Sequence, residues 1–140
     1  MRIAIINGPN LNEIGTREPE IYGSTSFEEA GHQWEELFPH TQIQLHQSNQ
    51  EGILIDLIQR LKNEVDGLII NAGAYAHTSI AIADALRSVT IPMVEVHMSN
   101  IHARESYRKS SYMAEVVDAV IVGMGMQGYA LAIQYLIFKD

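Results

Sequence analysis

The clearest signal of the fold is in residues 67–97, which read GLIINAGAYAHTSIAIADALRSVTIPMVEVH. It begins with a short apolar run at 67–70 that stops at a polar, glycine-containing turn, which is typical of a buried strand. Apolar residues at helical spacing follow in 78–88, and a second apolar run at 91–97 predicts another strand. A strand, a helix and a strand in this order predict two parallel strands joined by a right-handed crossover.

The rest of the chain repeats this alternation. Three further strands are predicted at 2–6, 42–46 and 119–122, and three further helices at 27–38, 53–61 and 129–138. Thr25 and Glu28 fit a capping box ahead of the first helix, and the alternation in 42–46 is typical of a half-exposed strand near a sheet edge. Five strands separated by helices predict an α/β fold, a flavodoxin-like three-layer α/β/α sandwich with a five-stranded parallel sheet.

The size and composition favour a single soluble domain over 1–140. The chain has 140 residues, of which 46% are hydrophobic and 19% charged, and these values are ordinary for globular proteins. Because it has no cysteine, disulfides, thiolate nucleophiles and thiolate metal sites are excluded. We therefore expect a cytoplasmic protein.

The charge balance argues against two classes of partner. The formal net charge is −8, whereas nucleic acids and anionic membrane surfaces attract proteins rich in Lys and Arg. No charged-then-apolar leader opens the sequence, and the most apolar stretch is interrupted by Asp118, Gly123 and Gly125 before it reaches bilayer-spanning length. We expect neither a nucleic-acid nor a membrane partner.

The segments that follow the strands are the candidate ligand-binding elements. In open parallel sheets, ligands bind beyond the carboxyl ends of the strands. The segments there are polar and rich in glycine: NGPNLN, QSN, NAGAYAH, VHMSN and GMGMQG. A polar stretch at 10–23 is long for a loop in a compact domain, and such loops are usually functional or disordered.

Cofactor and metal chemistry find little support in the sequence. Residues 123–128 spell G-x-G-x-x-G, but they precede the last helix and no strand follows, so a tight strand-to-helix turn is favoured over a dinucleotide site. Lys62, Lys109 and Lys139 all lie outside the predicted strands, which disfavours a buried imine-forming amine. No H-E-x-x-H motif or tight acidic cluster appears, and we expect no metal and no cofactor.

Two pairs of residues suggest acid–base chemistry. Glu95 and His97 are two apart in a strand, so they face the same side, where a carboxylate orients an imidazole that acts as a general acid. A structural buried pair or an exposed strand end is the alternative. In the long loop, Arg17 near Tyr22 would lower the phenol's pKa and make it a base, the alternative being a packed tyrosine in an exposed loop.

Weaker signals surround these pairs. Asn71, His77 and Asp84 straddle one strand-to-helix junction, where each alone is usually a surface or loop residue. Arg104 and Arg108 follow the strand that carries His97 and would share a face if that segment were helical. They suggest an anion site, with salt bridges to Glu105 as the simpler alternative.

Taken together, five ordered blocks of the sequence resemble the type II 3-dehydroquinate dehydratase family. They are NGPNLNEIGTREPEIYG (7–23), QSNQEGILIDLIQ (47–59), NAGAYAHTSIAIADAL (71–86), VEVHMSNIHARESYRKSSY (94–112) and GMGMQGYALAI (123–133). The resemblance implies a flavodoxin-like subunit of a homododecamer, a tetramer of trimers. It implies a hydro-lyase that converts 3-dehydroquinate into 3-dehydroshikimate, a shikimate-pathway step, without metal or organic cofactor. Biosynthesis of aromatic amino acids and breakdown of quinate both use this dehydration, and the sequence leaves the two open.

The resemblance also implies residue roles. Tyr22 is the base, Arg17 lowers its pKa, and Asn12 helps to hold the enolate oxygen through a water; His97 is the acid, oriented by Glu95. The substrate carboxylate and hydroxyls are implied to meet a further set of residues: Asn71, His77, Met98, Ser99, Arg108 and, from a neighbouring subunit, Asp84. Arg104 is implied to contact the loop at 10–23, which acts as a lid.

Two positions depart from the family pattern. Ala72 stands where the family commonly has proline, and Ala76 where it has threonine, which puts substrate affinity in doubt more than activity.

Two other functions remain open. A non-catalytic module that binds a small polyhydroxy acid would need the same fold. A hydrolase using Ser79 or Ser99 lacks the G-x-S-x-G elbow expected of that chemistry.

Overall fold

A five-stranded parallel sheet forms the centre of the protein. The computed structural model describes residues 1–16, 20 and 24–139, and the sheet order is β2-β1-β3-β4-β5. The strands are β1 (Arg2–Asn7), β2 (Gln42–Gln47), β3 (Gly67–Asn71), β4 (Met93–His97) and β5 (Ala119–Val122). Every neighbouring pair is parallel. This order is that of flavodoxin-like folds, so the predicted fold class is confirmed.

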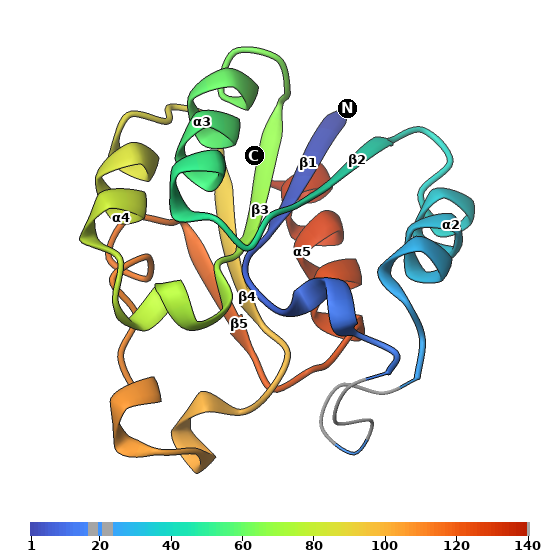
Figure 1. The fold of residues 1–140 in the computed structure, drawn as a ribbon. Helices are drawn as coiled ribbons and strands as arrows, with labels where there is room; N and C mark the ends of the chain where they lie inside the picture. Colours follow the sequence, from blue (N-terminus) through green and yellow to red (C-terminus); the bar gives the residue numbers. More distant parts are fainter. Residues whose placement is uncertain (17–19, 21–23, 140) are drawn as a thin grey trace.

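Helices cover both faces of the sheet (Figure 1). One face carries α3 (Glu51–Leu61) and α4 (Ile80–Arg87), and the other carries α2 (Phe27–Leu37) and α5 (Gln127–Phe138). Short 3-10 turns lie mostly beyond the carboxyl ends of the strands: η1 (Leu11–Glu13), η2 (Gly73–His77), η3 (Ile101–Ala103) and η4 (Ser106–Arg108). None of the helices in the described ranges is long and apolar enough to cross a membrane.

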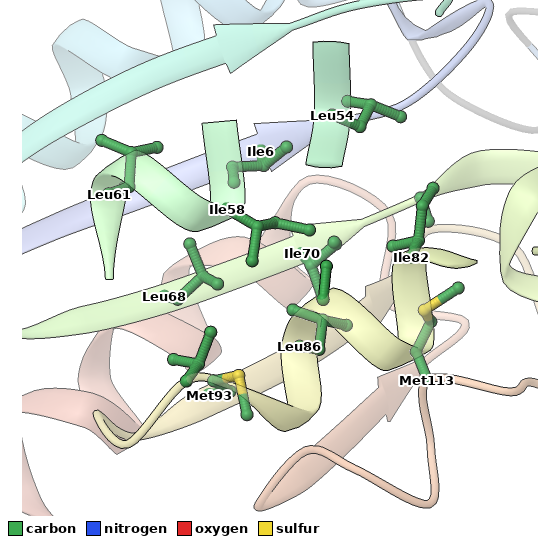
Figure 2. Packing of buried hydrophobic residues seen from close by; sticks show 14 of the residues in the cluster. Ile6, Leu54, Ile58, Leu61, Leu68, Ile70, Ile82, Leu86, Met93 and Met113 are labelled. Atoms are coloured by element: carbon green, nitrogen blue, oxygen red, sulfur yellow. The ribbon is translucent and has the colours of Figure 1, made fainter. Parts of the chain in front are cut away.

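The side-chain alternation of the strands builds two cores. Along β1, Ile3 and Ile5 pack with α2 and α5, while Ala4 and Ile6 pack with α3 and α4. Because β1, β3 and β4 are buried on both faces, their sequences are almost continuously apolar. Figure 2 shows the second of these cores, in which Leu68 and Ile70 of β3 meet the helices, and Met113 joins from the segment before β5.

Several elements begin about two residues from their predicted starts: α3 begins earlier at Glu51, α5 earlier at Gln127, and β4 later at Met93. The capping box of α2 is formed by Ser26 and Glu29, one residue later than the predicted Thr25 and Glu28. Both pairs have the spacing that a capping box requires, so the sequence alone does not distinguish them. Helix α4 is capped by Ser79, whose Oγ accepts from the Ile82 amide, since the preceding residues form the 3-10 turn η2. The edge position of β2 is confirmed.

Glycines allow close approach at the carboxyl ends of the strands. A Cβ on Gly8 would lie 2.3 Å from the Ala72 carbonyl oxygen, so the turns after β1 and β3 touch only because Gly8 has no side chain. Gly123 and Gly125 have φ values of +83° and +55°, and they form the predicted tight turn between β5 and α5. Their amides donate to the carbonyls of His97 and Met98, which fixes the end of β4.

Candidate active site

An open cleft lies beyond the carboxyl ends of β1, β3 and β4. It encloses about 720 Å³, including the space at its mouth. The segments after all three strands line it: Pro9, Asn10, Leu11, Ile14, Asn71, Gly73, Ala74, His77, His97, Met98, Ser99, Ile101, Arg104 and Arg108. The cleft therefore occupies the position where ligands bind in folds of this class.

The side chains of Glu95 and His97 form a buried pair at one wall of the cleft. His97 Nε2 lies 2.8 Å from Glu95 Oε1, and the two side chains are 5% and 0% exposed. The geometry predicted from their two-residue spacing in β4 is confirmed. Because a carboxylate only accepts, Nε2 carries the hydrogen of this bond, and Nδ1 is the ring nitrogen left for other partners. His97 lines the cleft, whereas Glu95 lies behind it.

A second imidazole stacks on His97. The ring of His77, from η2, lies 5.9 Å from that of His97 between centroids, with 25° between the planes. His77 Nδ1 lies 2.7 Å from the Ser110 carbonyl oxygen, and so Nδ1 donates and Nε2 is left as an acceptor while the ring is neutral. Each ring thus has one nitrogen fixed by the protein and one available to a ligand.

A buried hydrogen-bond chain orients Asn71 at the end of β3. Its Nδ2 donates to the Tyr129 hydroxyl at 2.7 Å, and that hydroxyl donates to Asn7 Oδ1 at 2.8 Å. The Gly73 amide donates to Asn71 Oδ1 at 3.1 Å. Burial raises the pKa of the Tyr129 phenol, so the bridging hydroxyl keeps its proton. The Asn71 amide is consequently held in one orientation beside the cleft.

Two arginines line the cleft close to Glu105. Arg108 Nε donates to Glu105 Oε2 at 2.9 Å, and Arg104 Nε lies 3.7 Å from the same oxygen. A hydrogen bond from its own backbone amide, together with the two arginines, holds the pKa of Glu105 below its usual value. Arg104 Nη1 also donates to Ser99 Oγ at 3.3 Å. The salt bridges to Glu105, one of the two alternatives from the sequence, are present, and both arginines also line the cleft. The anion site stays a prediction.

The predicted site residues do not all meet in this cleft. Asn12, within η1, lines a neighbouring hollow of about 610 Å³, where Gln47 Nε2 donates to its Oδ1 at 3.4 Å. Asp84 lies on the outer side of α4, where it pairs with Arg87 at 2.6 Å and its side chain is 64% exposed. Arg17 and Tyr22 lie outside the described residues.

Sequence reasoning missed several supporting residues. Tyr129 and Asn7 have no predicted role beyond a helix, a turn and the resembling blocks, and their link spans 122 positions, which no local pattern reveals. Ser111, whose hydroxyl lies 2.5 Å from Glu95 Oε1, appeared only inside a resembling block. Within the described residues, no group of three or more His, Cys, Asp or Glu side chains is placed to hold a metal ion.

Comparison with known proteins identifies the family. Residues 1–137 match the model of the family described as dehydroquinase class II. The chain belongs to this family. It is 50% identical to the 3-dehydroquinate dehydratase of Dinoroseobacter shibae, covering 95% of this chain and 90% of that protein. It is 48% identical to the catabolic 3-dehydroquinase of Aspergillus oryzae, over 96% and 89% of the two chains.

A solved structure of the same family supports this assignment. The crystal structure of the type II dehydroquinase from Butyrivibrio crossotus superposes with a TM-score of 0.93 at 45% identity, covering 98% of this chain and 97% of that one. The two positions at which the sequence departs from the family pattern both lie behind the cleft. Ala72 and Ala76 are 1% and 0% exposed and pack in the core with α3 and α4.

Proposed function

We propose that the chain is a hydro-lyase that dehydrates 3-dehydroquinate to 3-dehydroshikimate. The observation that carries this proposal is the buried Glu95–His97 pair, whose imidazole faces a cleft in a chain of the class II dehydroquinase family. The names of the curated relatives support the same reaction for this chain.

The reaction needs a base, a place for negative charge and an acid. A base takes a proton from the carbon next to the ketone, and the electrons of that C–H bond form an enolate. The enolate then expels the neighbouring hydroxyl, which leaves as water with a proton from the acid. His97 is the proposed acid in its doubly protonated form, in which Nε2–H bonds Glu95 and Nδ1–H, the hydrogen not held by Glu95, is given to the leaving hydroxyl; the ring then regains a proton from solvent. The base then returns its proton to solvent.

The base is proposed to be Tyr22, with Arg17 lowering its pKa, and Asn12 is proposed to hold the enolate oxygen through a water. The segment 10–23 that carries them is proposed as a lid of the single catalytic domain 1–140. The described part of this segment supports the role, since Leu11 and Ile14 form the wall shared by the cleft and the neighbouring hollow.

The remaining cleft residues are proposed to bind the substrate. Asn71 and the amides of Met98 and Ser99 would meet its carboxylate, while Arg108 and His77 would hold ring hydroxyls. The exposed position of Asp84 on α4 suits its proposed contact with the site of a neighbouring subunit in a homododecamer. A cytoplasmic location is part of the same proposal.

A Tyr22→Phe variant tests this function against the non-catalytic binding module. For an enzyme, turnover of 3-dehydroquinate falls by about 10²–10⁴-fold, because the base is lost, while calorimetric affinity for the substrate changes little. A module that only binds a polyhydroxy acid shows binding by both proteins and turnover by neither. That second result would overturn the proposal.

A further inference from the structure

We propose that Ser111 is a positioning residue for the acid of this site. Its hydroxyl holds the Glu95 carboxylate in the orientation that directs the His97 ring into the cleft. The kinetic part of this inference rests on the proposed function, whereas its structural part stands on the hydrogen bonds alone.

The hydrogen bonds of Ser111 leave one role for its proton. The Met113 amide donates to Ser111 Oγ at 3.0 Å, and Ser111 Oγ lies 2.5 Å from Glu95 Oε1. An amide only donates and a carboxylate only accepts, so the hydroxyl receives one bond and gives the other to Glu95. Glu95 Oε1 therefore accepts two hydrogen bonds, one from Ser111 and one from His97.

The other carboxylate oxygen cannot supply this orientation. Among the described residues, Glu95 Oε2 has no hydrogen-bond partner, although the side chain is fully buried. The terminal torsion of a glutamate is soft, so a carboxylate held by one bond at one oxygen can turn about it. The second donor, Ser111, fixes the plane of the carboxylate and hence the direction of the bond to His97 Nε2.

The backbone around Ser111 is itself anchored. The Met113 side chain is fully buried in the core with α3 and α4 (Figure 2), and the Tyr112 amide donates to the Ala76 carbonyl at 2.9 Å. The Ser110 carbonyl, one residue earlier, accepts from His77 Nδ1. The segment 110–113 therefore fixes one nitrogen of each stacked imidazole, directly for His77 and through Glu95 for His97.

Ser111 acts through another residue and does not touch the ligand. It is absent from the lining of the cleft, so its loss leaves the binding surface intact. A structural role alone, in which the hydroxyl merely caps the turn through the Met113 amide, would lower stability without changing chemistry. A positioning role lowers kcat, leaves KM unchanged and alters the environment of the His97 ring proton.

The test compares Ser111→Ala with Ser111→Thr, which keeps the hydroxyl, and with Ser88→Ala as a matched control. The Ser88 hydroxyl likewise gives one bond, to the Ala85 carbonyl at 2.8 Å, and receives one, from Lys62 Nζ at 3.1 Å, but it lies at the far end of α4. Each folded variant is measured for kcat and KM with 3-dehydroquinate and for the ¹H–¹⁵N signal of His97 Nε2–H. If Ser111→Ala does not fold, Ser111→Cys replaces it, because a thiol keeps the volume and is a weak donor.

The expected result is a kcat about tenfold lower for Ser111→Ala, which is less than the about 10²–10⁴-fold loss expected for removing a general acid altogether. KM stays unchanged, the ring-proton signal shifts or disappears, Ser111→Thr restores both, and Ser88→Ala matches the wild type. An unchanged kcat and ring-proton signal in Ser111→Ala would overturn the inference. If the wild type has no activity, the proposed function fails, and the ring-proton comparison still decides whether Ser111 orients the pair.

Discussion

Replacing Tyr129 by Phe removes one hydroxyl from the centre of the molecule. In the wild type this hydroxyl bridges Asn7 Oδ1 and Asn71 Nδ2, and Tyr129 is fully buried. The ring itself stays packed, stacked at 5.4 Å on Trp34 and edge-on at 5.2 Å to Phe27, so little apolar burial is lost. The change leaves one buried acceptor and one buried donor unpaired, at about 1–3 kcal/mol each.

The free energy of unfolding should therefore fall by about 2–6 kcal/mol, which corresponds to a Tm lower by on the order of 10 °C in a chain of this size. Urea unfolding followed by fluorescence measures it directly, because Trp34 is the single tryptophan and is buried beside Tyr129. Tyr135→Phe on the same helix is the control, since Tyr135 is 37% exposed and its change should stay within about 0.5 kcal/mol. A Tyr129→Phe effect as small as that of the control would refute the reasoning that this bridge holds Asn71.

Three further predictions follow from the same structure. Burial raises the folded-state pKa of Tyr129 above its unfolded value near 10, so its contribution to the free energy of unfolding is fully present below about pH 10. Above that pH the contribution is lost at up to about 1.4 kcal/mol per pH unit. Urea titrations at several alkaline pH values should therefore show a steeper loss for the wild type than for Tyr129→Phe. Gly8→Ala should lower the free energy of unfolding by more than about 3 kcal/mol, because its Cβ would lie 2.3 Å from the Ala72 carbonyl oxygen. Gly52→Ala, whose Cβ would have nothing within 4 Å, should raise it by up to about 1 kcal/mol, and equal melting temperatures for the two variants would contradict this. Ala72→Pro should stabilise by about 0.5–1 kcal/mol, since Ala72 has φ of −72° and follows a strand residue; a lower Tm would show that the family's proline does not fit this turn.

Local periodicity predicted most of the fold. The alternation of short apolar runs with amphipathic segments was sufficient for the parallel sheet, and the exposed alternation in 42–46 was sufficient to place β2 at the edge. The contact between Glu95 and His97 followed from the two-residue repeat of a strand. These predictions succeeded because each depends on neighbours in the sequence.

The predictions that failed depended on a choice between equivalent local patterns. Thr25 with Glu28 and Ser26 with Glu29 have the same capping spacing, and only the backbone conformation at Ser26 selects the second. A shared face for Arg104 and Arg108 depends on a continuous helix, whereas their segment forms two separate 3-10 turns; both arginines nevertheless line the cleft.

Contacts between distant parts of the chain were beyond sequence reasoning. The bridge from Asn7 through Tyr129 to Asn71 joins the first strand, the last helix and the third strand, and nothing in the local sequence of Tyr129 marks it as buried support for the cleft. The hydroxyl of Ser111 reaches Glu95 across 16 positions through an irregular segment that has no periodicity to interpret.

The most direct test of the account is the ultraviolet absorbance of purified, chelator-treated protein mixed with 3-dehydroquinate. Dehydration creates a conjugated enone that the substrate lacks, so the absorbance should rise with the wild type. The rise should be slower by about 10²–10⁴-fold with His97→Asn, which removes the acid. A flat trace from the folded wild-type protein would mean that the chain does not dehydrate 3-dehydroquinate.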